Sequence, residues 1–496
     1  MTSALRPPAS SVRRTSRPLL RRLYALLPLA LLSVACDPAV PRFVEEPSPS
    51  PAPLPPDATR FNWEEWLVDA GNGGAETHMT LDLEGRPVMA YFAPQFGTFE
   101  PDPPDLPGTP TPAPAQGFGT PQLYELRVAR FNGSGWDVET VVNTNQARGL
   151  SIAQSKTGPL MVAYLESNPN SESVWCSAGR LMVATDGPDG WTSTPVAEPE
   201  GQLDPTCDLQ GCTPCEVAGE FPSIAEGASG QVGITYRRAR YTLETLSNPD
   251  SDQEFQEFNF SNGVFTKVQR RVIQSGTGAG FYGSLTYAAD GGGTFRPHIA
   301  YLSLGQDVEE GASTLSGLWY AYYDGAGWQA RELQREHDWL SGPQIQVSVY
   351  EGEVNILLYA WMGDNSTAKL DLILMRSTDQ GLSWTPEYIT HDGRAGGFPS
   401  LDRKPDGTPV VSYYQCTSVV DYICSAEGDG LILAERPGFE WESSVVHADP
   451  LTYDGMYSAM VWTRSGPVIA ARSGTARTPD EVRTLYTYFG EALEDN

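Results

Sequence analysis

The chain has 496 residues, and its 62 acidic and 33 basic side chains give a formal net charge of −29 at pH 7. A surface this acidic repels nucleic acid and anionic lipid, so we expect no nucleic-acid partner and assign the charge to solubility. Glycine (49) and proline (41) are spread along the chain, as in proteins with many tight turns, and long helical patterns are absent.

Residues 1–35 have the composition of an export signal peptide. Paired arginines precede an apolar run over residues 23–34 that is too short to span a bilayer comfortably. The run ends directly before Cys36 and resembles the bacterial lipoprotein signal, which is cut before a cysteine that is then acylated. That family prefers leucine three residues before the cysteine, where this chain has Ser33. We predict lipid attachment at Cys36; the alternative is ordinary cleavage beside an unmodified cysteine.

The segment after Cys36 has the composition of a spacer. Residues 47–56 read Pro-Ser-Pro-Ser-Pro-Ala-Pro-Leu-Pro-Pro. Proline at this density keeps a chain extended and prevents it from packing a core. We therefore expect residues 36–60 to be a tether that holds a domain over residues 61–496 away from a membrane.

Six cysteines remain besides Cys36, and an even number in an oxidising compartment favours disulfides. They are Cys176, Cys207, Cys212, Cys215, Cys416 and Cys424. Cys416 and Cys424 flank one loop and are predicted to pair. The other four are predicted to form two bridges of open connectivity. The Cys-x2-Cys spacing of Cys212 and Cys215 leaves a zinc site as the alternative, which export disfavours.

One pattern returns seven times in residues 61–496: a small polar residue in an apolar strand, a glycine turn, and a proline-led strand that ends in tyrosine. The copies cover residues 80–91, 151–164, 223–236, 284–301, 344–359, 400–413 and 458–471, and the last copy lacks the tyrosine. A second pattern alternates with the first: a strand, a glycine turn and an aromatic-led strand. Its aromatic residues are Trp136, Trp191, Phe265, Trp328, Trp384 and Trp441.

Each unit therefore carries four short strands, and four antiparallel strands repeated about seven times predict an all-β, seven-bladed β-propeller. Single blades cannot bury their own faces, so the repeated tryptophans are expected to pack between blades. The last unit lacks its fourth strand, and residues 61–68 form an orphan strand at the start. We predict that residues 61–68 pair with residues 484–489 and close the ring, which removes exposed sheet edges.

One glycine turn is more specific than the others. Residues 377–384 read Ser-Thr-Asp-Gln-Gly-Leu-Ser-Trp, so that Ser377, Asp379, Gly381 and Trp384 resemble the Asp-box of sialidase-like (BNR-repeat) propellers. Asp379 can bond turn amides, Gly381 can supply a positive φ, and Trp384 can pack. The resemblance covers residues 61–496 and implies a fold. In that family the Asp-box is structural and lies on the face opposite the active site.

The resemblance places the long loops on the other face. They cover residues 93–122, 165–178, 198–219, 240–253, 304–316 and 414–429, and the cysteines other than Cys36 lie on or beside them. Long, cross-linked loops on one face of a rigid ring are where binding is expected.

A sialidase would bring an arginine triad, a Tyr–Glu nucleophile pair and an acidic aspartate, none of which the sequence assigns. Arg296 lies in a faint counterpart of the family's arginine motif, but in the fourth unit rather than the first. The candidates for a ligand-binding face are Arg237, Arg238, Arg240, His337 and His391. The alternative is that these side chains are solvated or locally paired.

No other motif in the sequence indicates a metal site, a nucleotide site or a catalytic nucleophile. The five histidines are scattered, and the chain has no complete calcium loop, nucleotide-binding motif or nucleophile elbow. We therefore expect no cofactor and no metal.

Two functional hypotheses follow. The first is a monomeric cell-envelope lipoprotein whose propeller is a non-catalytic binding or scaffold module for a protein or glycan, with inner and outer membrane both open. The second is a sialidase-like glycoside hydrolase.

Overall fold

The structure is a computed structural model that describes residues 60–71, 73–94, 123–144, 149–156, 158–167, 179–200, 215–228, 230–241, 250–290, 292–304, 316–336, 345–362, 369–390, 395–415, 419–420, 423–424, 429–449, 452–474 and 483–493. The chain divides into two compact units, Met1–Pro49 and Ser50–Asn496. Every described residue lies in the second unit. In this part of the chain no helix is long and apolar enough to cross a membrane.

The described residues form β-strands in antiparallel sheets, five of which have four strands. One contains β2 (Ala75–Leu81), β3 (Pro87–Pro94), β4 (Tyr124–Phe131) and β5 (Trp136–Thr144). Another contains β14 (Ala279–Ala289), β15 (Phe295–Leu304), β16 (Ser316–Tyr323) and β17 (Trp328–Glu336). The next contains β18 (Ile345–Tyr350), β19 (Glu353–Met362), β20 (Lys369–Ser377) and β21 (Thr385–Thr390).

Two further four-stranded sheets complete this set. One contains β22 (Ala395–Arg403), β23 (Pro409–Gln415), β26 (Gly430–Glu435) and β27 (Glu442–Ala448), with a small hairpin of β24 (Val419–Val420) and β25 (Ile423–Cys424) between β23 and β26. The other contains β28 (Tyr453–Trp462), β29 (Pro467–Gly474), β30 (Thr484–Ala492) and β1 (Phe61–Asp69).

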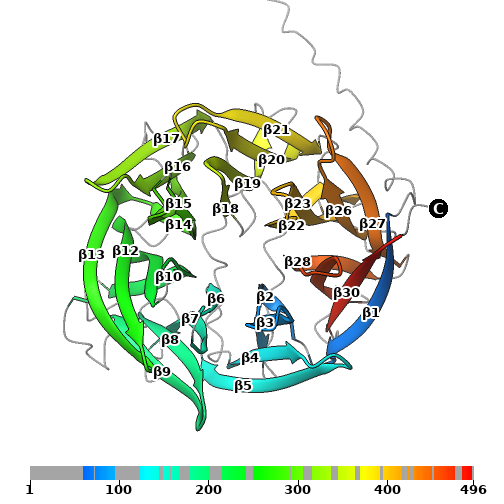
Figure 1. Ribbon diagram of the computed structural model, residues 1–496, viewed down its shortest axis with the longest axis horizontal. Coiled ribbons are helices and arrows are strands. Elements are labelled where there is room, and N and C mark those ends of the chain that lie inside the picture. Colours follow the sequence, from blue (N-terminus) through cyan, green and yellow to red (C-terminus); the bar gives the residue numbers. More distant parts are fainter. Residues whose placement is uncertain are drawn as a thin grey trace, which may run out of the picture. The chain divides into compact units, whose positions relative to one another are not determined.

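The sixth sheet has eight strands, made of two antiparallel sets of four. The first set is β6 (Leu150–Gln154), β7 (Leu160–Ser167), β8 (Gly179–Gly187) and β9 (Gly190–Ala197). The second set is β10 (Cys215–Glu226), β11 (Gln231–Tyr241), β12 (Asp250–Ser261) and β13 (Val264–Thr277). Figure 1 shows all the sheets arranged radially in chain order around one axis. The protein is therefore an all-β propeller of four-stranded antiparallel blades.

The expectation of seven separate four-stranded sheets is corrected where β8 and β10 meet. Ala218 and Arg180 form a parallel bridge that joins the two sets into one sheet. The bridge forms because glycine allows close approach: a Cβ at Gly219 would lie 2.8 Å from the Leu181 side chain, and one at Gly179 would lie 2.9 Å from Val217. Five four-stranded sheets are therefore separate, and the remaining two sets of four strands form one eight-stranded sheet.

Two loops are shorter than the sequence analysis expects. β12 already begins at Asp250, because Ser251 donates a hydrogen bond to the Ala279 carbonyl (2.8 Å) and Asp252 pairs with Arg240 (3.0 Å). β10 begins at Cys215. The expectation of a loop over residues 240–253 is wrong at both ends of that range, where β11 and β12 lie, and the expectation over residues 198–219 is wrong from residue 215 onward.

β1 joins the two ends of the described chain. It pairs with β30 in antiparallel register from Phe61 opposite Ala492 to Asp69 opposite Leu485, the partner strand predicted from the sequence. Phe61 packs against Trp63 (5.5 Å between ring centroids) and Trp462 of β28 (6.0 Å). Figure 1 shows β1 beside β30, where the start of the ring meets its end.

The repeated tryptophans lie between sheets, as the repeat predicts. Trp384 of the β18–β21 sheet packs against Tyr320 of the preceding sheet, with 5.1 Å between ring centroids. Trp136 of the first sheet donates from Nε1 to Thr487 of β30 (2.9 Å). Burial on both faces also explains why second strands such as β3 and β23 are buried at every position.

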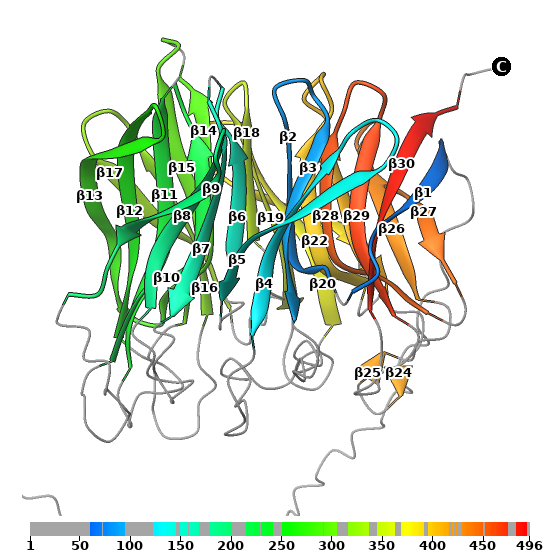
Figure 2. The same ribbon diagram turned by 90° about the horizontal axis from the view of Figure 1, so that it is seen from below.

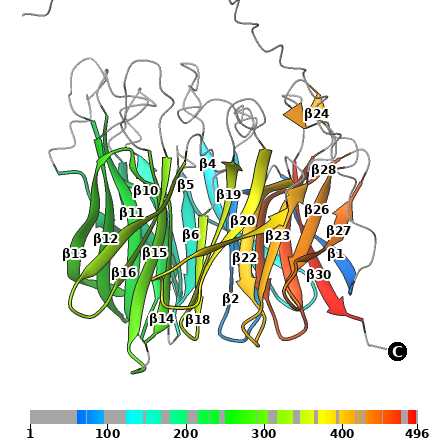
Figure 3. The same ribbon diagram turned by 90° about the horizontal axis from the view of Figure 1, so that it is seen from above.

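The two faces of the ring differ in their connections. Figures 2 and 3 show the turns that join the first and second strands of the sheets on one face, which we call the short-turn face. The hairpin β24–β25, which follows a second strand, lies on the opposite face, which we call the long-loop face.

Candidate functional site

The first strand of each four-stranded set lies nearest the axis, and most of these inner strands contain the same bulge (Figure 1). A glycine with positive φ is followed two residues later by a non-glycine residue with φ near 50°. The non-glycine residues are Glu76, Phe221, Tyr282, Phe398 and Tyr457. The strand register shifts at each bulge. The bulge marks the end of the inner strand that faces the long-loop face.

Two residues after the bulge, polar side chains join neighbouring sheets. Ser223 accepts a hydrogen bond from the Leu285 amide, Ser284 from the Val347 amide and Ser400 from the Met460 amide, each at 3.0 Å. Ser151 and Gln346 accept in the same way from Ile224 and Leu401. This ladder explains the small polar residue of the sequence repeat: it satisfies an amide that no strand partner reaches.

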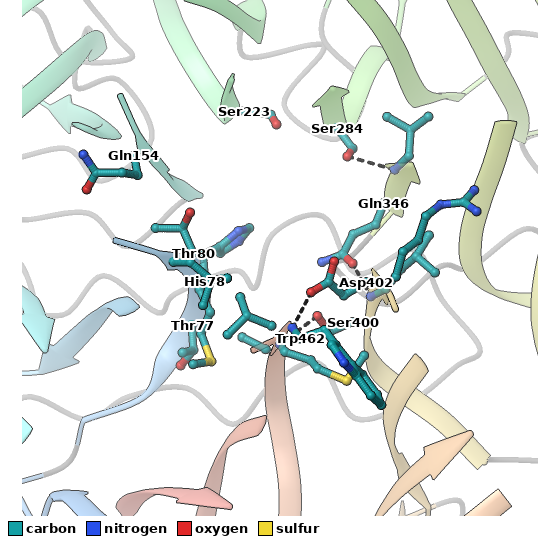
Figure 4. A pocket seen from close by; sticks show the side chains of 18 of the residues that line it. Thr77, His78, Thr80, Gln154, Ser223, Ser284, Gln346, Ser400, Asp402 and Trp462 are labelled. Carbon is teal, nitrogen blue, oxygen red and sulfur yellow. Dashed lines mark hydrogen bonds between the residues drawn. The ribbon is translucent and has the colours of Figure 1, made fainter. Parts of the chain in front are cut away.

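The inner strands enclose a cavity of about 580 Å³. All seven inner strands contribute to its lining, and Figure 4 shows its side chains. The polar lining residues are Thr77, His78, Thr80, Gln154, Lys156, Ser223, Ser284, Gln346, Ser400, Asp402 and Arg403. The lining begins one or two residues after the bulges and continues to the ends of the inner strands, so the cavity faces the short-turn side. Among these lining residues Asp402 supplies the one carboxyl group.

Burial shifts the pKa values of two of the titratable groups that line this cavity, Asp402 and His78. It raises the pKa of the Asp402 carboxyl to about 6, although the Trp462 amide donates to that carboxyl at 2.6 Å. It lowers the pKa of His78 to about 4. At neutral pH His78 is therefore uncharged, whereas Asp402 is ionised at an energetic cost.

Aromatic side chains lie at the bulges, between the cavity and the long-loop face. The ring centroids of Phe221 and Tyr282 are 4.6 Å apart, and those of Phe398 and Tyr457 are 4.5 Å apart. Burial raises the pKa of Tyr282 to about 12, and the charge of Glu76 adds to the rise. This end of the ring therefore brings a tyrosine and a glutamate into one electrostatic environment, with the hydroxyl kept protonated.

Arg237, a predicted candidate for the ligand face, lies at this end but is buried. Its Nη1 pairs with Glu220 at 2.9 Å, and Tyr241 donates to the other oxygen of that carboxylate at 2.7 Å. Its guanidinium lies 3.7 Å from the centre of the Phe281 ring, and its Nη2 has no hydrogen-bond partner in the described part of the chain.

The other predicted arginines are also paired. Arg238 is buried and bonds Glu254 (3.0 Å) and Glu216. Arg240 pairs with Asp252, as described above, and keeps 37% of its side chain exposed. Arg296 pairs with Asp290 at 2.7 Å. The structure thus gives each of these arginines its own carboxylate and does not gather them around one exposed pocket.

The turn whose sequence resembles the Asp-box, called the Asp-box turn below, lies between β20 and β21. Asp379 accepts hydrogen bonds from the amides of Leu382 (3.0 Å) and Ser383 (2.8 Å) and from the Ser383 hydroxyl (2.6 Å). These bonds hold its pKa at about 2. Ser377 accepts from the amide of Gly381 (2.8 Å), whose φ is 86°. The side chains of this motif bond one another and form a turn.

Several predicted residues lie outside the described residues: Cys36, Cys176, Cys207, Cys212, Cys416, His337 and His391. The backbones of Cys215 and Cys424 lie in β10 and β25, with Cys424 opposite Val419. Among the described residues, no group of three or more His, Cys, Asp or Glu side chains is arranged to hold a metal ion.

The inner-strand residues His78 and Asp402 were not singled out by the sequence analysis. They are 324 positions apart in the chain and line one cavity because the inner strands surround the same axis. A usable signal was present in the bulge, since Phe-Pro-Ser occurs at residues 221–223 and again at 398–400.

Comparison with known proteins finds similar solved structures. The sequence matches no protein-family model and no curated protein. Among solved structures, the chain is similar to a protein of unknown function from Dyadobacter fermentans (13% identity, TM-score 0.46, covering 87% of this chain and 98% of that one). It is also similar to the NanB sialidase of Streptococcus pneumoniae (13%, 0.42, 88% and 71%) and to an alpha-L-arabinanase of Penicillium chrysogenum (12%, 0.42, 68% and 92%).

Proposed function

We propose that this chain is a bacterial cell-envelope lipoprotein whose seven-bladed propeller is a non-catalytic binding module for a glycan or a protein. The count of seven takes the eight-stranded sheet as two blades, each with its own inner strand, β6 or β10. The anchor is the acylated Cys36, and residues 36–60 are the tether, as the sequence indicates. A rigid closed ring on a tether presents a surface without needing chemistry of its own.

The observation that carries the non-catalytic assignment is the pairing of the candidate arginines. An arginine that binds a ligand carboxylate must have two N–H groups free to donate to its two oxygens. Arg237 and Arg238 are instead buried against Glu220, Glu216 and Glu254. Displacing those carboxylates would leave buried charges unpaired, which is costly.

One further observation argues against hydrolysis of the common type. That reaction uses two carboxyl groups on either side of the glycosidic bond, and the cavity lining supplies Asp402 alone.

The experiment is retention with product analysis. Purified residues 61–496 are passed over immobilised envelope glycans, and the eluate is assayed for new reducing ends. We expect retention without new reducing ends. Release of reducing ends by the protein would contradict the proposal, and absence of retention would restrict the ligand to protein.

The anchor has its own test. Cys36→Ala removes the thiol that receives the lipid, so we expect the variant to move from the membrane to the soluble fraction on fractionation of the producing cells. Cys424→Ala is the control, since it changes a cysteine without touching the anchor. Unchanged membrane association of Cys36→Ala would contradict the lipoprotein assignment.

A further inference from the structure

We infer that the cavity enclosed by the inner strands is a binding site for a neutral sugar residue, which enters from the short-turn face. This inference rests on the proposed glycan-binding function and names where the ligand sits and its chemical class. It differs from the expectation that binding occurs on the long-loop face.

The ladder turns the cavity wall into a set of hydrogen-bond donors. A serine oxygen that accepts an amide hydrogen bond still carries its own hydroxyl proton. The hydroxyl protons of Ser223, Ser284 and Ser400 have no acceptor in the described part of the chain, and the NH2 group of Gln346 is likewise unused while its oxygen accepts from Leu401. Donors from four sheets therefore remain for the acceptor oxygens of a ligand.

The charge of the cavity favours a neutral ligand. Asp402 supplies a carboxylate, which accepts from ligand hydroxyls and repels an anion. The two cations that line the cavity are held by the chain: Lys156 is exposed and donates to the Gly227 carbonyl, and Arg403 pairs with the Glu353 carboxylate (3.4 Å) and donates to the Gly407 carbonyl (2.7 Å). A molecule with many hydroxyl groups and no charge matches donors on one side and a carboxylate on another.

The volume of the cavity and a further free hydroxyl group also fit a neutral sugar. A volume of about 580 Å³ lies within the range of small-molecule sites and accommodates a sugar residue. Thr80 adds a hydroxyl group, and no hydrogen bond ties it to a described residue. Figure 4 shows Thr80, Gln346 and Asp402 around this one cavity, from three different inner strands.

The test uses the full chain in detergent with D-glucose, D-galactose and, as a charged comparison, D-glucuronate. Saturation-transfer NMR detects binding and calorimetry gives the dissociation constants. The variants are Thr80→Val and Asp402→Asn, which keep side-chain shape, and Thr192→Val on the exposed strand β9 is the matched control. We expect a neutral sugar to bind, with affinity lowered about fivefold by Thr80→Val and about tenfold by Asp402→Asn, and unchanged by Thr192→Val.

The outcomes distinguish failure of the cavity as the binding site from failure of the proposed binding function. Binding of a neutral sugar that both cavity variants leave unchanged would overturn the cavity as the site while leaving the binding function standing. Tighter binding of glucuronate than of both neutral sugars would overturn the neutral class. Absence of binding by all three sugars would overturn the inference, and the glycan-retention experiment would then decide the proposed function separately.

Discussion

At the scale of residues, serine side chains on the inner strands link neighbouring sheets by hydrogen bonds to backbone amides. Ser223, Ser284 and Ser400 stand out by recurrence, and the structure shows that each satisfies an amide of the next sheet. Arg237 and Arg238 were expected on a ligand face. Their burial depends on carboxylates of other strands, Glu220, Glu216 and Glu254, and a linear pattern does not show such pairs.

The free energy of unfolding should depend on pH through the Asp402 carboxyl. Because its folded pKa is about 6, above the ordinary 3.8, the folded state holds an extra proton between these values. Its contribution to stability is therefore fully present below about pH 4 and is lost as pH rises through about 6. In Asp402→Asn this loss is absent, so the free energy of unfolding of the variant relative to wild type should rise by about 2 kcal/mol between pH 4 and pH 7.

Urea unfolding at several pH values measures this difference. The Asn side chain keeps an oxygen for the Trp462 amide, so the ladder is retained in the variant. A difference between variant and wild type that stays constant from pH 4 to pH 7 would show that the carboxyl titrates normally in the folded protein.

At the scale of elements, the repeat predicted the strands well because apolar runs and glycine turns recur within each unit. It failed where a strand continues past its apolar part. β12 starts with Asp250, Ser251 and Asp252, which read as a loop, yet hydrogen bonds to neighbouring strands order them. The parallel bridge between β8 and β10 was also beyond prediction, since it depends on the spacing between two sets of strands.

The Asp-box turn is predicted to be fixed by contact with its neighbour. A Cβ at Gly381 would lie 2.4 Å from the buried ring of Tyr320, and φ there is 86°. Gly381→Ala should therefore lower the free energy of unfolding by about 3 kcal/mol or more. Gly263 has φ 77° with no atom within 4 Å of its added Cβ, so Gly263→Ala should cost about 1 kcal/mol, for the backbone alone. Equal losses of stability in Gly381→Ala and Gly263→Ala, measured by thermal or urea unfolding, would mean that the Tyr320 ring moves aside for the added methyl group.

At the scale of the whole molecule, the closed ring determines the site. The orphan strand at residues 61–68 and the incomplete last unit together indicated which strands must meet, and β1 pairs with β30. The cavity could not be foreseen in the same way, because its residues come from seven inner strands that are far apart in the sequence. Its chemistry appears only after the ring is assembled.

Removing β1 tests the closure. Deletion of residues 61–69 leaves β30 as an exposed edge and uncovers Trp462, which Phe61 covers. We expect the truncated protein to aggregate or to unfold at markedly lower temperature, as followed by light scattering during heating. A truncated protein that stays monomeric and melts like the full chain would show that the ring does not depend on this strand.

Binding without hydrolysis is tested by measuring turnover of a fluorogenic sialoside by purified residues 61–496. We expect no turnover above the uncatalysed rate, for wild type and for Tyr282→Phe alike. Turnover by wild type that Tyr282→Phe abolishes, in a variant with an unchanged melting temperature, would contradict this expectation and would make this chain a sialidase-like hydrolase.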